Sequence, residues 1–202
     1  MQIFFSADYH LNHANIIKYC NRPFMHYDDV DEDLNWKSEE IKLRRCQDMN
    51  KTIIRNHNKK ITDDDILYHL GDFCFGSESQ RWENMLNGTI IHILGNHDKN
   101  NKVKSYITSA NMKAGGLNIY AVHKPPVDRQ VDTIESHYIA NCDIILCGHV
   151  HNLWKHKWIE VWNQSCKIKK LCINVGIDVW GYEPITIRSI LKYIAKVKRE
   201  GL

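Results

Sequence analysis

Short runs of apolar residues, rich in isoleucine, recur along the chain, and most of them end at a glycine or a polar side chain. Runs of this length with this content of β-branched residues are typical of buried strands. We therefore predict strands over residues 2–7, 66–70, 89–94, 117–122, 143–147 and 170–175.

Apolar residues spaced three and four positions apart predict helices between these strands. Ser38, followed by Glu39 and Glu40, is typical of a helix start, because acidic side chains favour the positive end of the helix dipole. Strands that alternate with helices indicate α/β layering. We predict helices over residues 13–19, from 38 to at least 53, over 77–86 with Ser77 as its cap, over 102–110 and 133–140, and from 186 to near the end of the chain.

Three tryptophans near the end of the chain leave two interpretations open. Trp154, Trp158 and Trp162 are four positions apart, which fits a helix. The polar residues 163–165, between segments of alternating apolar and polar residues, fit a β-hairpin. We favour the hairpin.

Length and composition predict one globular domain over residues 1–202. No apolar run approaches the roughly 18 residues of a membrane helix, and the first residues do not resemble a signal sequence, so we expect a cytoplasmic protein. The net charge of +3 does not indicate nucleic acid as a partner, although it does not exclude it. Seven cysteines without a C-x-x-C pair favour reduced, packed thiols.

Potential metal ligands follow five of the predicted strands. Taken alone, each group has an alternative interpretation: an isolated D-x-H is more often a strand-end turn, and Gly-Asn-His-Asp is equally a polar turn. Recurrence at five strand ends favours one shared site, because α/β layering brings such ends to one rim. Residues i and i+2 of a strand point the same way, so the first two side chains can converge on one ion. The candidate ligands are Asp8, His10, Asp72, Asn96, His123, His149 and His151.

These motifs, in this order, resemble the calcineurin-like metallophosphoesterases. The motifs are Asp8-Tyr9-His10, Gly71-Asp72, Gly95-Asn96-His97-Asp98, His123 and Gly148-His149-Val150-His151. The chain is most similar to the small single-domain phosphoesterases of bacteria and phages, whose sequences are also similar to residues 13–17, 21–24 and 174–180 of this chain. The resemblance implies a four-layer α/β/β/α sandwich of two mixed sheets with flanking helices.

The resemblance also implies two divalent metal ions bridged by Asp72. Spacing alone would direct His149 and His151 to a single ion, whereas the family pattern divides them. Manganese is the metal we expect, with iron, nickel, zinc and magnesium as alternatives for nitrogen and oxygen ligands. The implied ligand sets are Asp8, His10, Asp72 and His151 for one ion, and Asp72, Asn96, His123 and His149 for the other.

The chemistry implied is attack on a phosphate ester by a hydroxide that bridges the two ions. His97 is expected to act on the leaving oxygen as an acid, with Asp98 orienting its imidazole. Arg22 is a candidate to bind the substrate phosphate, although a surface-loop arginine is an equally good interpretation.

The predicted function is therefore that of a metal-dependent phosphoesterase acting on a small phosphodiester or nucleotide. A phosphomonoesterase on the same site is the nearest alternative; a nuclease, which the weak net charge does not favour, and a scaffold that keeps the fold without its chemistry are others. Residues 31–48 and 159–170 resemble insertions that could form a lid, a dimer contact or a substrate wall. Oligomeric state stays open.

Overall fold

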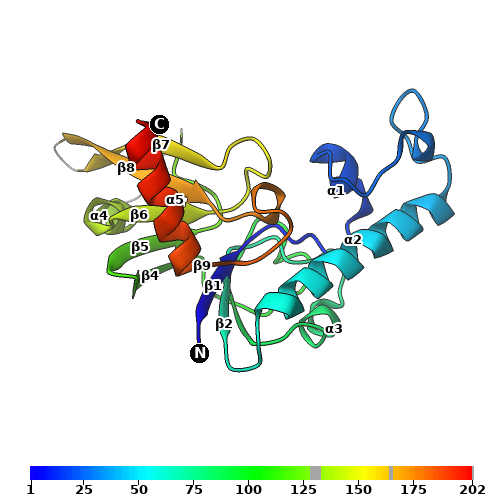
Figure 1. Cartoon of the computed structure of the whole chain (residues 1–202), viewed down its shortest axis with the longest axis horizontal. Helices are drawn as coiled ribbons and strands as arrows, with labels where there is room; N and C mark the ends of the chain where they lie inside the picture. Colours follow the sequence, from blue (N-terminus) through cyan, green and yellow to red (C-terminus); the bar gives the residue numbers. More distant parts are fainter. Residues whose placement is uncertain (128–132, 164–165, 202) are drawn as a thin grey trace.

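Two mixed β-sheets stack face to face in the computed structural model, which describes residues 1–127, 133–163 and 166–201 (Figure 1). In the first sheet the order is β3 (Thr89–His92), β2 (Ile66–His69), β1 (Ile3–Ser6) and β9 (Ile185–Thr186), and only β9 is antiparallel to its neighbour. In the second the order is β4 (Ser109–Ala114), β5 (Leu117–Val122), β6 (Ile144–Cys147), β8 (Cys166–Asn174) and β7 (His156–Asn163), with antiparallel pairs at both edges.

Both faces of the central strands are buried, which explains why their sequences are apolar without a polar face. In β6, Ile144 and Leu146 pack into the core between the sheets, whereas Ile145 and Cys147 pack on the outer side of the second sheet. Side chains of successive strand residues point to opposite faces, so each core takes every second residue.

Helices cover the two outer faces, and a further helix packs against the core between the sheets. The helices α1 (Ala14–Tyr19), α2 (Glu39–Lys60) and α3 (Ser79–Glu83) contribute to the core on the first sheet, and α4 (Thr133–Asn141) to that on the second. Figure 1 shows α2 and α4 at opposite sides of the molecule. The last helix, α5 (Ile187–Glu200), adds its apolar stripe to the core between the sheets. The predicted four-layer sandwich is confirmed.

Local signals predicted several element boundaries. Ser38 caps α2, since its Oγ accepts the Ile41 amide at 3.1 Å, and Thr186 caps α5 in the same way. The predicted hairpin is the pair β7–β8, in which β7 contains Trp158 and Trp162; residues 164–165 lie outside the described residues. The cap at Ser77 is wrong, because α3 begins later, after Glu78.

The predicted helix over 102–110 is also wrong. Its apolar residues have helical spacing, but residues 103–107 are irregular and Ser109–Ala114 pairs with β5 through a tight turn at Gly115 and Gly116. Both glycines have positive φ, a conformation that suits glycine and allows the hairpin to close. Cross-strand pairing therefore outweighs the local pattern.

The two apparent insertions lie on different layers. Residues 31–48 form a loop and the beginning of α2, and the described residues of the segment 159–170 lie in β7 and β8. The cysteines whose side chains the structure describes are buried free thiols, as expected. None of the helices in the described part of the chain has the length and apolar character needed to span a bilayer.

Candidate metal centre

The seven candidate ligands come together at the rim where β1, β2, β3, β5 and β6 end. They include two groups of three residues, and within each group the ligand atoms lie within 4.8 Å of one another. We call Asp8, His10 and His151 the first cluster, and Asp72, His123 and His149 the second cluster.

Asp72 lies between the two clusters. Its Oδ2 is 3.6 Å from Nε2 of His10 and 3.4 Å from Nε2 of His123. The seventh residue, Asn96, is exposed beside the second cluster, with Oδ1 3.0 Å from Nε2 of His123. Nitrogen and oxygen donors thus form one continuous group with a carboxylate in its middle.

The backbone holds most of these residues in an unusual conformation. Asp8, His10, Asp72, His149 and His151 all have φ between 46° and 70°. Aspartate and histidine adopt this left-handed region more readily than most residues, yet it still costs free energy and is found mainly at functional sites. The loops after the strands therefore aim these side chains. We predicted that Asp8 and His10 point the same way because both lie on a strand. This reason is wrong, because β1 ends at Ser6, before either residue.

The first cluster is supported by a buried ion pair. Nδ1 of His151 donates to Oδ2 of Asp178 at 2.9 Å, which leaves Nε2 for the site. Arg22 holds Asp178 through two bonds, from Nε at 2.8 Å and from Nη2 at 3.0 Å. Nη2 also donates to the Asp8 carbonyl at 2.7 Å.

This geometry corrects the substrate-binding role expected of Arg22. The side chain is fully buried, and its donors are occupied by Asp178 and by the carbonyls of Asp8 and Tyr9. It cannot reach a phosphate at the rim. Its contacts make Arg22 a support for the loop that carries Asp8 and for the partner of His151.

His10 provides the test of whether a cation fits here. Its Nδ1 is 3.3 Å from Nδ1 of His13, while its Nε2 is buried and has no hydrogen-bond partner. A buried polar atom without a partner is costly unless something binds it. Burial also lowers the pKa of His10 well below its ordinary value, so the imidazole is neutral and can ligate a metal. The donor set and the unpartnered nitrogen fit a divalent cation.

The second cluster is supported by the backbone. Nδ1 of His123 donates to the Leu70 carbonyl at 2.7 Å, which turns Nε2 toward Asp72. Gly95 allows the loop after β3 to approach, because a Cβ at this position would overlap Oδ1 of Asp72. The amide of His97 then donates to the same Oδ1 at 3.0 Å.

The prediction that Asp98 orients the His97 imidazole is wrong. Its Oδ1 accepts the Phe73 amide at 2.8 Å, and its Oδ2 accepts the amides of Asp72 and Gly95 at 2.8 and 2.7 Å. The carboxylate is buried and joins the loops after β2 and β3. Its role is to fix the position of Asp72.

His97 itself lies on the solvent side of the site. Its side chain is 43% exposed, and Nε2 is 4.0 Å from Oδ2 of Asp72. Its ring lies 5.7 Å from that of His10 and 5.5 Å from that of Phe75. From there the imidazole can reach a group bound at the rim.

Burial and charge shift the pKa values of the ligands in opposite directions. Desolvation raises the pKa of Asp8 to about 6. Desolvation would lower the pKa of His123, but the hydrogen bond with Asp72 outweighs it and raises the value to about 9. In His151 the bond to Asp178 likewise overcomes desolvation and raises the pKa to about 10. A cation that binds these imidazoles must therefore displace protons.

Three residues that support the site, Asp178, His13 and Phe75, had no role in the prediction from sequence. Asp178 lies in the 174–180 segment noted above, but nothing local showed that its partner would be His151. His13 contacts His10 and stacks on Phe75, with ring centroids 3.8 Å apart. The available signals were that His13 begins the 13–17 segment noted above, and that His13 and Phe75 each lie three positions after a motif residue.

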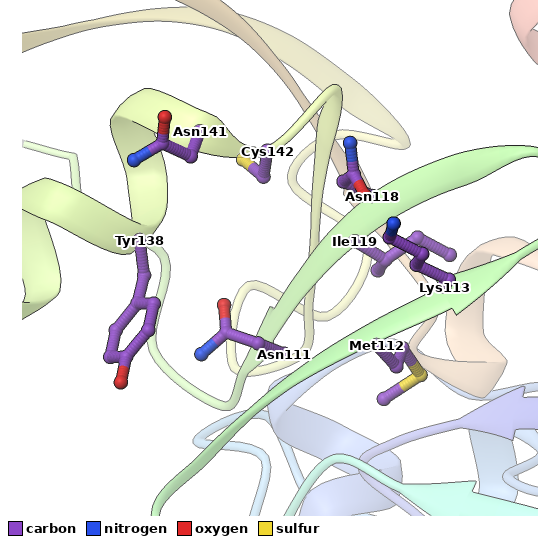
Figure 2. Close-up of a pocket in the computed structure, with 8 residues that line it drawn as sticks. All are labelled: Asn111, Met112, Lys113, Asn118, Ile119, Tyr138, Asn141 and Cys142. Atoms are coloured by element: carbon purple, nitrogen blue, oxygen red, sulfur yellow. The ribbon is translucent and has the colours of Figure 1, made fainter.

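Two cavities differ in their relation to this centre. One, of about 530 Å³, adjoins the second cluster and is lined by His123, Asn96 and Lys124 among others. Another, of about 510 Å³, lies between β4, β5 and the end of α4, where Figure 2 shows Asn111, Tyr138 and Asn141 around it. None of the seven candidate ligands lines this second cavity.

Comparison with known proteins gives the class of protein. A sequence model of the calcineurin-like phosphoesterase superfamily domain matches residues 48–180. That range includes Asp72, Asn96 and the three histidines of the later motifs, whereas Asp8 and His10 precede it. The chain belongs to the calcineurin-like phosphoesterase superfamily, whose members are metal-dependent.

Individual relatives are similar over nearly the whole chain. An uncharacterized protein of Methanocaldococcus jannaschii is 33% identical over 204 residues, covering 98% of this chain and 93% of its own. A crystal structure of a protein of unknown function from Aquifex aeolicus has a TM-score of 0.61 and 25% identity, covering 95% of this chain and 98% of its own. The structure of an archaeal phosphodiesterase has a TM-score of 0.37 and 16% identity, covering 87% and 84%, which is too distant to indicate an activity.

Proposed function

We propose that this protein is a metal-dependent phosphoesterase that holds two divalent cations and hydrolyses small phosphodiesters. The observation that carries the proposal is the pair of adjoining clusters, with Asp72 between them and a buried, unpartnered Nε2 on His10. When bound, two divalent ions would supply an activated water and a clamp for the phosphoryl group.

The contacts support one assignment of the ligand roles. Asp8, His10 and His151 would hold one ion, and His123, His149 and Asn96 the other, with Asp72 shared. Burial lowers the pKa of His149 to about 4, so this imidazole, like that of His10, presents a lone pair at neutral pH. Nitrogen and oxygen donors without a thiolate suit manganese, iron, nickel, zinc or magnesium better than copper(I), and manganese is the metal that we expect.

His97 would complete the site as the residue that acts on the leaving oxygen. Its exposed imidazole stands next to Asp72 without being a member of either cluster. A histidine in this position can give a proton to the departing oxygen. The cavity beside the second cluster leaves room for a second ester arm, which favours diesters over monoesters.

The test combines metal content with turnover. Protein stripped with a chelator and reloaded with manganese is assayed on bis-p-nitrophenyl phosphate and on p-nitrophenyl phosphate. We expect two metal equivalents by elemental analysis and a higher kcat/KM for the diester. A preference for the monoester would indicate a phosphomonoesterase. Protein that binds no metal, or that binds two equivalents and hydrolyses neither ester, would contradict the proposal.

A further inference from the structure

The cavity beside the second cluster lies between the loops that follow β3 and β5. Asn96 and His123, both beside Asp72, form its inner end. A substrate phosphate bound at the candidate centre would therefore have one of its ester arms at the mouth of this cavity. Its volume of about 530 Å³ is in the range of small-molecule sites.

Two lysines give this cavity a positive charge. Lys99 and Lys124 line it from opposite loops, and its other lining residues include no acidic side chain. Neither lysine forms an ion pair with another described residue. Leu94 and Val122 add an apolar wall. This combination suits a ligand with both an apolar part and a negative charge.

The opposite side of the centre has a different character. His97 approaches the rings of His10 and Phe75, and none of these three lines the cavity. If His97 acts on the leaving oxygen, the leaving group departs on this aromatic side. The arm that remains bonded to phosphorus then lies on the side of the lysines.

We propose that the substrate is a phosphodiester whose retained arm carries a further anionic group, bound by Lys99 and Lys124 in this cavity. The inference rests on the proposed function, because it takes the scissile phosphate to bind at the two clusters. It narrows the substrate class to diesters with a second phosphate or a carboxylate, such as a nucleotide phosphorylated at a second position. Two ammonium groups facing one dianion give a preference that salt weakens.

Two synthetic esters separate this second charge from the rest of the substrate. Thymidine 5′-(p-nitrophenyl phosphate) and its 3′-phosphorylated counterpart share the same leaving group and the same thymidine arm. In both, water adds to phosphorus, the bond to p-nitrophenolate breaks, and a proton is released to solution. The ratio of their kcat/KM values reports only the added phosphate.

We expect manganese-loaded protein to favour the phosphorylated ester by about tenfold, a preference that two partly exposed ion pairs can supply. In the variant Lys99→Gln/Lys124→Gln the ratio should fall to about one. The matched control Lys104→Gln/Lys157→Gln removes the same charge from exposed lysines outside the cavity, and it should keep the wild-type ratio. A wild-type ratio near one, or an unchanged ratio in the cavity variant, would overturn the proposal.

A binding measurement distinguishes failure of this proposal from failure of the proposed function. Calorimetry of the metal-loaded protein compares thymidine 3′,5′-bisphosphate with thymidine 5′-monophosphate, which needs no turnover. If the bisphosphate binds about ten times more tightly than the monophosphate, and this difference is lost in the cavity variant, the charged subsite is supported even if neither ester is hydrolysed. Hydrolysis of both esters at equal kcat/KM, with equal affinity for the two nucleotides, would support the phosphoesterase function and contradict the charged subsite.

Discussion

The two clusters of the candidate centre are supported by different kinds of bond. Behind the first cluster, His151 is held by Asp178, which is held by Arg22, so the support is a chain of charged side chains in the interior. Behind the second, His123 donates to the Leu70 carbonyl, and Asp98 joins backbone amides. One side depends on charge balance and the other on the path of the backbone.

This difference shows how each side responds to substitution. A buried ion pair is lost when one partner is removed, because the other charge is left unpaired in a medium of low polarity. A backbone carbonyl cannot be removed by substitution, so the support of His123 in the second cluster, unlike the Asp98 carboxylate, is not lost in this way. The second cluster is also the side that opens to the cavity and to solvent. The first cluster is thus the side that is more sensitive to substitution of the side chains behind it.

Asp72 belongs to both sides, so its replacement should have the largest effect. Asp72→Asn keeps the shape of the side chain but removes the charge shared between the clusters. We expect loss of both metal equivalents and a fall in turnover of roughly a thousandfold or more. Elemental analysis and diester hydrolysis measure the two together. The control Asp143→Asn changes an exposed aspartate outside the centre and should bind metal normally. Full metal content in Asp72→Asn would contradict a shared ligand.

His97 stands outside both clusters, and its replacement should separate chemistry from metal binding. In His97→Ala we expect both metal equivalents to remain and turnover to fall by about 10²–10⁴-fold. The loss should be greatest for esters with poorly acidic leaving groups, because these need the proton most. A series of aryl and alkyl diesters measures this dependence.

The exposed His137 on α4 provides the matched control, since His137→Ala removes an imidazole that belongs to none of the motifs. It should change neither metal content nor turnover. An equal loss for every leaving group in His97→Ala would assign His97 to positioning the substrate instead of donating a proton.

Arg22 tests the charge-dependent side through stability. Arg22→Met keeps much of the buried volume but leaves Asp178 without its partner, so we expect the free energy of unfolding to fall by about 3–5 kcal/mol. Urea denaturation of metal-free protein measures it. Lys42→Met, which breaks the exposed pair with Glu39, should cost less than about 1 kcal/mol.

The double variant Arg22→Met/Asp178→Asn shows whether the unpaired charge is the cause. It should recover part of the lost stability, because no buried carboxylate is then left without a partner. If Arg22→Met kept its stability and had a raised KM, the structural role of Arg22 would be contradicted and a phosphate-binding role would be supported.

The sequence alone determined the features that depend on local chemistry. Apolar runs predicted most of the strands, and Ser38 marked a helix start, because a capping hydroxyl accepts the amide three positions further on. Polar side chains recurring at strand ends indicated the seven candidate ligands, and the resemblance to a family implied the four-layer order. Even so, the extent of α3 and the false helix over 102–110 show the limit of local patterns.

Only the tertiary structure decided what surrounds those ligands. Arg22 and Asp178 are separated by 156 residues, so no pattern in either segment shows that they pair in the interior. Asp98 follows His97 directly, which suggested a partnership, but its carboxylate accepts amides of its own loop and of the loop after β2. Which neighbour a buried polar group takes depends on which chain segments the sheets bring together, and the physical reason is that burial requires every such group to be satisfied wherever the fold places it.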